Sequence, residues 1–393
     1  MVRATTDAAG VDADSGADPG NDLGSGTDLG ADTDTDTGTG AARRKRVRAL
    51  RAGPLAAVLT AALVVALTAA VSLGSVDIPP GEVWSVVGRR LTGQHPAPGT
   101  RDLIVWQLRV PRALLAAAVG AGLGLVGTAV QALVRNPLAD PYLLGISSGA
   151  SLGAVGVIVL GTGLGLELTV GGIAGLTVSV AAFLGALAAF SLVWLLARRG
   201  GGFSPLRLVL AGIGIGQFLT GLTSYLVLQT GDEQQTRGVL FWLMGSLSGA
   251  TWGQLAVPAA AVLLGLVLLQ GRARGLNAML MGDETAAGLG VDVVRLRREI
   301  FAVTSVLTGV LVAVSGAIGF VGLMVPHVCR LLVGGDHRRL LPLSALTGAV
   351  LLVVVDLIAR TALDGQEVPI GVVTALLGAP TLLYLLDRRL ERN

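Results

Sequence analysis

Long apolar stretches separated by short polar ones are the dominant pattern of this chain. Ten stretches each approach the length of about 20 residues that crosses the hydrocarbon core of a bilayer. The sequence therefore predicts an all-α polytopic membrane protein with about ten transmembrane helices. We place them at residues 54–74, 111–134, 142–161, 171–197, 206–228, 252–270, 298–316, 319–334, 340–361 and 369–386.

Arginine placement predicts the orientation of these spans. The basic cluster Arg43–Arg51 precedes the first span, and clustered Arg and Lys stay on the cytoplasmic side. An even number of spans puts both termini on that side. Arginines of the alternate loops fall on the same side, whereas the outside loop 75–108 is an exception. It carries Arg89, Arg90 and Arg101.

Two blocks of four spans run in opposite directions. Spans two to five begin outside and spans seven to ten begin inside, which favours an inverted repeat. Glycine is abundant, with 57 residues, and clusters within spans. Small residues at such spacing let helix backbones approach closely, so we read these clusters as packing positions, with a lining of the pathway as the alternative.

Residues 1–41 differ from the rest of the chain. They are rich in Asp, Gly and Thr and hold almost no large apolar side chain. Such a segment buries too little surface to offset chain entropy, so it is predicted to be a disordered acidic cytoplasmic tail. Residues 42–393 form the predicted ten-helix transmembrane domain.

Composition excludes several kinds of site. Lys45 is the only lysine, and it lies in the basic cluster, so the Gly-Lys-Ser/Thr of a phosphate-binding P-loop is absent. If ATP drives this protein, another chain hydrolyses it. Cys329 is the single cysteine, and the three histidines are scattered, so the sequence indicates no intrachain disulfide and no metal site.

Residues 276–297 form a polar island between two apolar stretches. Gly288 and Gly290 interrupt its helical pattern, and Asp292 is suited to cap a second short helix. Two short helices between two spans would protrude from the membrane, and their apolar face needs a partner. We interpret the island as the docking point of a motor protein, with a helix lying among lipid headgroups as the alternative. The apolar face repeats at helical spacing through Met279, Leu280, Ala286, Ala287 and Leu289.

Two groups of motifs carry further information. The first runs from Arg109-Val-Pro-Arg112 through Gln131-Ala-Leu-Val-Arg-Asn-Pro-Leu-Ala-Asp-Pro141 to the Ser-Ser-Gly-Ala that ends at Ala150. Its two X-Pro steps predict a stop between two spans, because the residue before proline avoids the helical region. The second runs from Gly316 to His327, continues with Asp356 and Arg360, and ends in Glu367-Val-Pro-Ile-Gly. Asp356 and Arg360 are four apart in one span, so they can pair.

From residue 54 to the C-terminus, these segments resemble the FecCD-type permease subunits of ABC importers for iron–siderophore complexes, haem and vitamin B12. The resemblance departs from the last motif only at Val368, where the family has Leu. It implies the type II ABC importer permease fold, and a chain that works beside a second permease subunit, as a homodimer or a heterodimer. Two ABC ATPase subunits and an extracytoplasmic substrate-binding protein complete the complex. No cofactor is expected on this chain, since ATP and magnesium belong to the ATPase, and no nucleic acid is expected.

The resemblance also assigns roles by position. Arginines that grip the binding protein correspond to Arg109, Arg112 and Arg360, with interfacial snorkelling or pairing with Asp356 as the alternatives. An inner gate corresponds to Ser204, Pro205 and Leu206, where the local residues differ from the family pattern. The fifth and tenth spans would line the pathway. His327 and Arg330 are read as structural rather than as transport residues. The coupling helices correspond to residues 276–291, centred on Asp283, Glu284, Thr285, Ala286, Ala287, Gly288 and Gly290.

Other classes of protein make different demands on the sequence. An ion-driven secondary transporter with an inverted repeat needs carboxylates near the bilayer midplane, and only Asp356 is a convincing candidate. A membrane enzyme needs catalytic groups within the spans, and none of the familiar arrangements is present. We therefore expect no catalytic residue, and a multi-pass protein of the cytoplasmic membrane that imports a ferric siderophore, haem or cobalamin, the siderophore being favoured.

Overall fold

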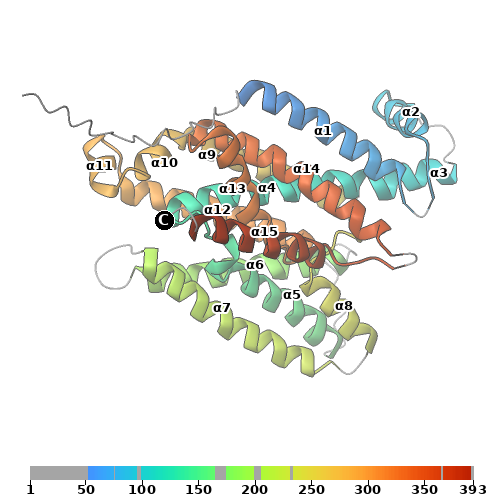
Figure 1. Cartoon of the computed structure of the whole chain (residues 1–393). Coiled ribbons are helices and arrows are strands. Elements are labelled where there is room, and N and C mark those ends of the chain that lie inside the picture. The colour runs from blue at the N-terminus through green and yellow to red at the C-terminus, as the bar shows by residue number, and fades with distance from the viewer. Residues whose placement is uncertain are drawn as a thin grey trace, which may run out of the picture. The chain divides into compact units, whose positions relative to one another are not determined.

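The chain folds into helices throughout the part that the structure describes. The computed structural model describes residues 52–74, 76–94, 99–163, 174–198, 205–230, 233–363 and 366–390. The predicted tail at 1–41 lies outside these residues. Figure 1 shows the elements, which in chain order are α1 (Ala52–Ser72), α2 (Pro80–Leu91), α3 (Thr100–Leu103), the π-helix η1 (Ile104–Arg109), α4 (Val110–Val134), the 3₁₀-helix η2 (Pro141–Leu144), α5 (Ile146–Gly163), α6 (Ala174–Ala197), α7 (Pro205–Leu228), α8 (Glu233–Leu243), α9 (Trp252–Gly271), α10 (Ala273–Met279), α11 (Asp283–Gly288), α12 (Val293–Ser315), α13 (Val321–Val333), α14 (His337–Thr361) and α15 (Ile370–Leu390).

The ten predicted spans each correspond to one of these helices. Among the described residues, seven helices are long and apolar enough to cross a membrane: α1, α4 together with α3 and η1, α6, α7, α9, α12 and α14. The apolar helices α5, α13 and α15 are shorter over their described residues and supply the other three. The prediction of an all-α polytopic membrane protein is confirmed.

Three helical segments in the loops were not predicted. They are α2, α3 with η1, and α8. In α2, Val83 and Val86 are buried while its remaining positions are mixed, a pattern too short to stand out in the sequence. The salt bridges of α2 and α3 explain the arginines that broke the charge rule, because Arg90 and Arg89 pair with Asp102 at 2.7 and 3.6 Å and Arg101 pairs with Glu82 at 2.9 Å.

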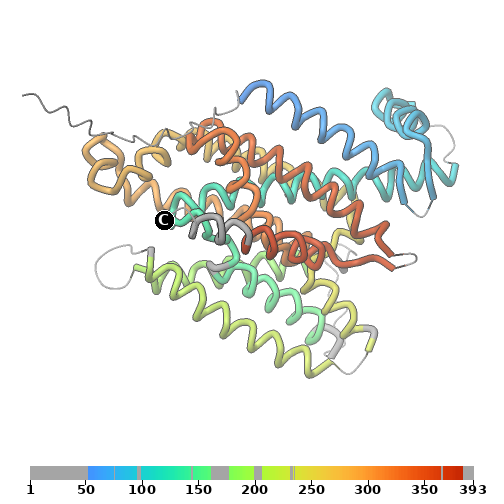
Figure 2. The backbone as a smooth tube through the Cα atoms, in the orientation of Figure 1, coloured from blue at the N-terminus to red at the C-terminus, as the bar shows by residue number. Residues whose placement is uncertain are grey.

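Glycines bring α4 into backbone contact with its neighbours. Gly120 of α4 and Gly348 of α14 face each other so closely that a Cβ on either one would overlap the carbonyl group of the other. Gly127 meets the backbone of Gly322 in α13 in the same way. These contacts support the packing reading of the glycine clusters, since a helix crossing without side chains maximises close van der Waals contact. The tube in Figure 2 shows α4 passing through the middle of the bundle beside α14.

The two four-span blocks pack by each placing its first helix against helices of the other block. The first helix of the first block, α4, packs against α13 and α14 of the second block. The first helix of the second block, α12, packs against α5 and α6 of the first. Each block therefore inserts its leading helix against the second and third helices of the other, which is the packing expected of an inverted repeat.

The two long motifs of the sequence meet at the start of α5 and α13. Asp140 caps η2 by accepting a hydrogen bond from the Tyr142 amide at 2.8 Å. The Tyr142 hydroxyl in turn accepts one from the Ile318 amide at 2.9 Å. Gly145 and Phe320, which directly precede α5 and α13, adopt φ of 72° and 66°. These two short spans therefore begin after a left-handed residue that turns the chain back into the bundle.

Candidate functional site

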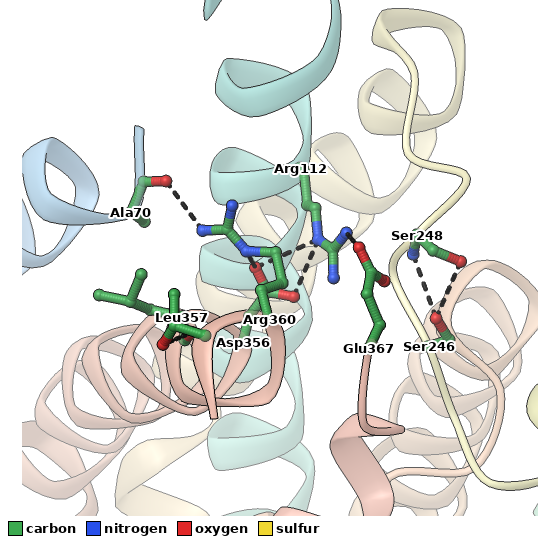
Figure 3. Close-up of polar contacts among 9 residues, drawn as sticks. Ala70, Arg112, Ser246, Ser248, Asp356, Leu357, Arg360 and Glu367 are labelled. Atoms are coloured by element: carbon green, nitrogen blue, oxygen red, sulfur yellow. Dashed lines mark hydrogen bonds and ion pairs between the residues drawn. The ribbon is translucent and has the colours of Figure 1, made fainter. Parts of the chain in front are cut away.

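Four charged side chains gather at one end of the bundle, and we call them the ion cluster: Arg112, Asp356, Arg360 and Glu367 (Figure 3). Arg112 lies in the first turn of α4, and its Nε donates to both Asp356 oxygens at 3.0 and 3.3 Å. Its Nη1 donates to Glu367 Oε1 at 2.9 Å. Arg360 Nε lies 3.2 Å from Asp356 Oδ2, and its Nη2 donates to the Ala70 carbonyl at 2.8 Å. The cluster thus joins α1, α4, α14 and the segment before α15.

Burial is uneven across this cluster. The side chain of Asp356 is 1% exposed, whereas those of Arg112 and Arg360 are 11% and 10% exposed. A buried carboxylate is stable only when paired, and here two guanidinium groups pair with it. Glu367 is different, because its side chain is 44% exposed and it meets the cluster through Oε1, which accepts from Arg112 Nη1. The prediction that Asp356 pairs with Arg360 is confirmed, and Arg112 is a second partner that the four-residue spacing did not show.

Arg109 bonds to a different segment of the chain. Its guanidinium is turned into the protein, with Nη1 donating to the carbonyls of Val71 and Ser72 at 2.8 and 3.0 Å and Nη2 to that of Val76 at 2.6 Å. Arg109 is 6% exposed and packs directly on Gly74. Arg109 therefore holds the loop between α1 and α2 through its hydrogen bonds. The two arginines were predicted to dock the binding protein together, but in the structure they bond to different parts of the chain.

A second charged group lies at the opposite end of the bundle, around α11. Asp283 begins α11 and accepts from Arg297 of α12 at 2.9 Å. It also pairs with Arg135, which follows α4 in a left-handed conformation with φ of 55°. Glycines at positive φ flank the six-residue helix, Gly282 at 112° and Gly290 at 81°. The Asp283 carboxylate therefore holds α11, which lies between two glycines at positive φ, to the residue after α4 and to α12.

The predicted apolar face of this segment is divided between two sides. Met279 and Ala286 are fully buried against the bundle. Leu280, Met281 and Leu289 are 50%, 68% and 64% exposed. The expected single face through Met279, Leu280, Ala286, Ala287 and Leu289 is thus wrong, because the two short helices meet at Gly282 rather than continuing one helical phase. Its exposed half still presents apolar surface at the tip of the bundle. Glu284, Thr285, Ala287, Gly288 and Gly290 are exposed beside it.

Asp292 caps a helix as predicted, but a different helix. Its side chain accepts from the Arg295 amide at 2.9 Å and starts α12, the long seventh span. The two short helices are instead α10 and α11, and α12 begins five residues earlier than the predicted span at 298 because the cap lies at Asp292.

Asn277 anchors α10 to the turn before α14. Its Nδ2 donates to Asp336 Oδ1 at 2.7 Å, and its Oδ1 accepts from the His337 amide at 2.9 Å. The Asn277 hydrogen bond, followed by the bond from the Arg338 amide and the nearby arginines, holds the pKa of Asp336 below its usual range. The sequence alone does not point to Asn277, Asp336, Arg135 and Arg297, because each bonds to a side chain 14 or more residues away in the chain.

The predicted inner gate is only partly visible. Ser204 lies outside the described residues, and Pro205 is the first residue of α7. Leu206 is 67% exposed. His327 and Arg330 fit the structural reading. Arg330 donates from Nη2 to Gln131 Oε1 at 2.9 Å, while Gln131 Nε2 donates to the Leu323 carbonyl at 3.2 Å, so this pair joins α4 to α13.

The described residues contain no group of three or more His, Cys, Asp or Glu side chains that could hold a metal ion. The charged side chains described above instead gather at two ends of a close-packed helical bundle. Helices of membrane length, packed as interlocked blocks with short helices projecting between the sixth and seventh spans, define a transport permease. This chain belongs to the FecCD transport family, whose profile matches residues 62–388.

Relatives of known name are similar over most of their length. The cobalamin import system permease protein BtuC of Halobacterium salinarum is 44% identical over 75% of this chain and 76% of its own. The hemin transport system permease protein HmuU of Yersinia pestis is 43% identical over 74% of this chain and 85% of its own. A metal-chelate type ABC transporter solved in an inward-facing conformation has a TM-score of 0.71 at 30% identity, covering 86% of this chain and 99% of that one. The chain is thus a multi-pass membrane permease of the ABC importer type.

Proposed function

We propose that this chain is one of a pair of permease subunits that import a metal chelate across the cytoplasmic membrane, with both termini in the cytoplasm. The similar proteins are named for cobalamin, for hemin and for a metal chelate, and each of these is a bulky metal complex. The sequence expectation named a ferric siderophore, haem or cobalamin and favoured the siderophore, whereas the proposal keeps only the metal-complex chemistry that these substrates share.

The α10–α11 segment is the observation that carries the proposal. It holds exposed Leu280, Met281 and Leu289 at the tip of the bundle, while ion pairs and buried side chains fix its inner face. Exposed apolar surface of this kind marks a protein interface. Since the only lysine is Lys45, ATP hydrolysis requires a partner chain, and two ABC ATPase subunits docked at this segment would supply it.

The ion cluster at the other end is proposed to receive the extracytoplasmic binding protein. Arg112 and Arg360 supply the positive charge that acidic side chains of such a partner would meet, and complementary charge guides protein association. Arg109 has its donors occupied by the α1–α2 loop and supports this end from behind. The start of α7 at Pro205–Leu206, together with Ser204, is retained as the proposed inner gate, with α7 and α15 lining the pathway.

The geometry of Asp356 opposes an ion-gradient mechanism. A relay carboxylate must take up and release a cation in the membrane. Asp356 is instead held by the guanidinium groups of Arg112 and Arg360 at 3.0 and 3.2 Å. The cluster is therefore neutralised from within.

Reconstitution in liposomes tests the proposal. The permease is co-expressed with the ATPase and binding-protein chains encoded beside it, and ATP hydrolysis and uptake are measured with cobalamin, haem and a panel of ferric siderophores. We expect one loaded binding protein to stimulate ATP hydrolysis. Uptake that collapses with a protonophore while ATP is intact would instead support the ion-gradient mechanism.

A matched pair of variants localises the ATPase interface. Leu289→Ser alters the exposed face of the α11 end, whereas Leu91→Ser alters a leucine that is 77% exposed at the opposite end of the bundle. We expect the first variant to lower co-purification of the ATPase and the second to leave it unchanged. Equal behaviour of the two variants would contradict the assignment of the α10–α11 segment.

A further inference from the structure

The outermost charge of the ion cluster is negative. Glu367 is 44% exposed and pairs with Arg112, which is 11% exposed, so the carboxylate is the more accessible member of this ion pair (Figure 3). A surface that binds acidic side chains is therefore covered by an acidic side chain of its own. This arrangement calls for an account of how the arginine becomes available.

We propose that Glu367 is a displaceable cap on Arg112, which a carboxylate of the docking protein replaces. The inference rests on the proposed function, since it concerns the regulation of that docking surface. In the capped state Glu367 occupies the position on Arg112 Nη1 that the partner's carboxylate takes on docking.

The two carboxylates of the cluster are held very differently. Asp356 is 1% exposed and is contacted by both arginines, so its removal from the cluster would leave buried charges unpaired. Glu367 makes one bond, from Arg112 Nη1 to Oε1 at 2.9 Å, on the solvent side of the cluster. Ion pairs that remain partly in water are weak, because solvent screens them. Glu367 is thus the exchangeable partner of Arg112, and Asp356 is the permanent one.

Replacement of Glu367 on Arg112 by another carboxylate would also affect the start of α15. Glu367 stands three residues before α15, in a segment held by few other bonds. The Val368 amide donates to the Ala359 carbonyl at 3.0 Å, and the Ile370 and Gly371 amides donate to the carbonyls of Gly245 and Met244 at 3.0 and 3.1 Å. Displacement of Glu367 removes the Arg112 Nη1 bond, by which a side chain of this segment is held to α4. Docking would therefore loosen the start of a helix proposed to line the pathway, and α8 beside it, which ends just before Met244.

The test uses the complete complex with the binding protein encoded beside the permease, with and without cobalamin or haem. Glu367→Gln keeps the shape of the side chain and removes its charge. Losing a competitor of about 0.5–1 kcal/mol should tighten binding about two- to fivefold. We also expect higher ATP hydrolysis in the absence of the binding protein, because the neutral Gln side chain binds Arg112 more weakly and holds the segment before α15 less firmly to α4.

Two further variants separate the possible outcomes. Glu233→Gln removes the same charge from α8, where the side chain is 80% exposed and pairs with Arg237 instead of the cluster, and binding should be unchanged. Arg112→Gln should weaken binding, because it removes the docking cation itself. If Arg112→Gln weakens binding while Glu367→Gln leaves it unchanged or weaker, the cap is wrong and the docking surface stands. If neither variant alters binding, the assignment of the ion cluster as the docking surface is wrong, and the proposed role of Glu367 is wrong as well.

Discussion

The two ends of the bundle treat their charges in opposite ways. At the ion cluster, Asp356 is 1% exposed and sits between arginines from α4 and α14. At the α11 end, Asp283 is 43% exposed and holds a six-residue helix between two glycines at positive φ. The Asp356 ion pairs join α4 to α14, whereas the Asp283 ion pairs attach α11 to the spans α4 and α12. Charge pairing therefore joins spans to one another at one end and joins a short loop helix to the spans at the other.

Asp356→Ala should have the largest effect on stability. It leaves the guanidinium groups of Arg112 and Arg360 without their buried carboxylate, and removal of one member of a buried pair costs roughly 3–5 kcal/mol. Thermal unfolding of the purified protein in detergent measures the loss. Asp283→Ala is the matched control and should cost about 1 kcal/mol or less, because its carboxylate is half exposed. Equal losses would remove the distinction between the two ends.

Asp283→Asn should affect coupling more than folding. The change weakens the bonds that Arg135 and Arg297 make to the start of α11, so movement of the segment is no longer passed to α4 and α12. We expect the unfolding temperature to stay within a few degrees of the wild type, since the Asp283 side chain is 43% exposed and the oxygen of the asparagine amide can still accept hydrogen bonds. Transport per ATP hydrolysed in liposomes should fall about tenfold, corresponding to about 1.4 kcal/mol of lost coupling. Normal transport by this variant would show that Asp283 only supports the local fold.

Asn277→Ala should change the dependence of stability on pH. The folded state holds the pKa of Asp336 below its usual range, so the folded chain binds this proton less readily than the unfolded chain. The resulting stability is present above the ordinary Asp pKa of about 3.9 and is lost as the pH falls through the lower folded value. The variant should therefore lose less stability than the wild type when the pH is lowered from about 5 to 3.

Unfolding temperatures at several pH values measure this effect, which should be on the order of 1 °C. Gln270→Ala is a suitable control, because it removes the bond from Gln270 Nε2 to the Arg338 carbonyl at 2.8 Å without touching a carboxylate. Its curve should run parallel to that of the wild type. A parallel curve for Asn277→Ala as well would mean that Asn277 does not set the acidity of Asp336.

The spans were predictable from the sequence because each depends on local composition. A charge-free stretch of the right length crosses a membrane whatever it packs against. The interruptions by Asn136-Pro137 and Asp140-Pro141 were equally local. In contrast, α2 and α8 lie in loops, and their partners stand elsewhere in the chain, such as Asp102 for α2 and Ile158 for α8.

The charged side chains show the same limit more sharply. Arg109 and Arg112 are three residues apart, a spacing that places two side chains near one another on a regular helix. The π-helix η1 ends at Arg109, and the two side chains go to different partners, one to the α1–α2 loop and the other to Asp356. The sequence shows the motif but not the change of helical phase within it. The sequence shows Glu367 as part of a motif, and its role is suggested by the ion pair with Arg112, which only the structure shows.

The buried single cysteine has a practical consequence for experiments on motion. Cys329 is 1% exposed in α13, and its thiol donates to the Thr347 hydroxyl at 3.3 Å. Thiol-reactive spectroscopic labels react with accessible thiols, so the native chain offers a nearly silent background. New cysteines at exposed Met281 and Trp84, at opposite ends of the bundle, could be labelled selectively without first removing the native one. The distances between such labels would report how the α10–α11 segment moves during transport.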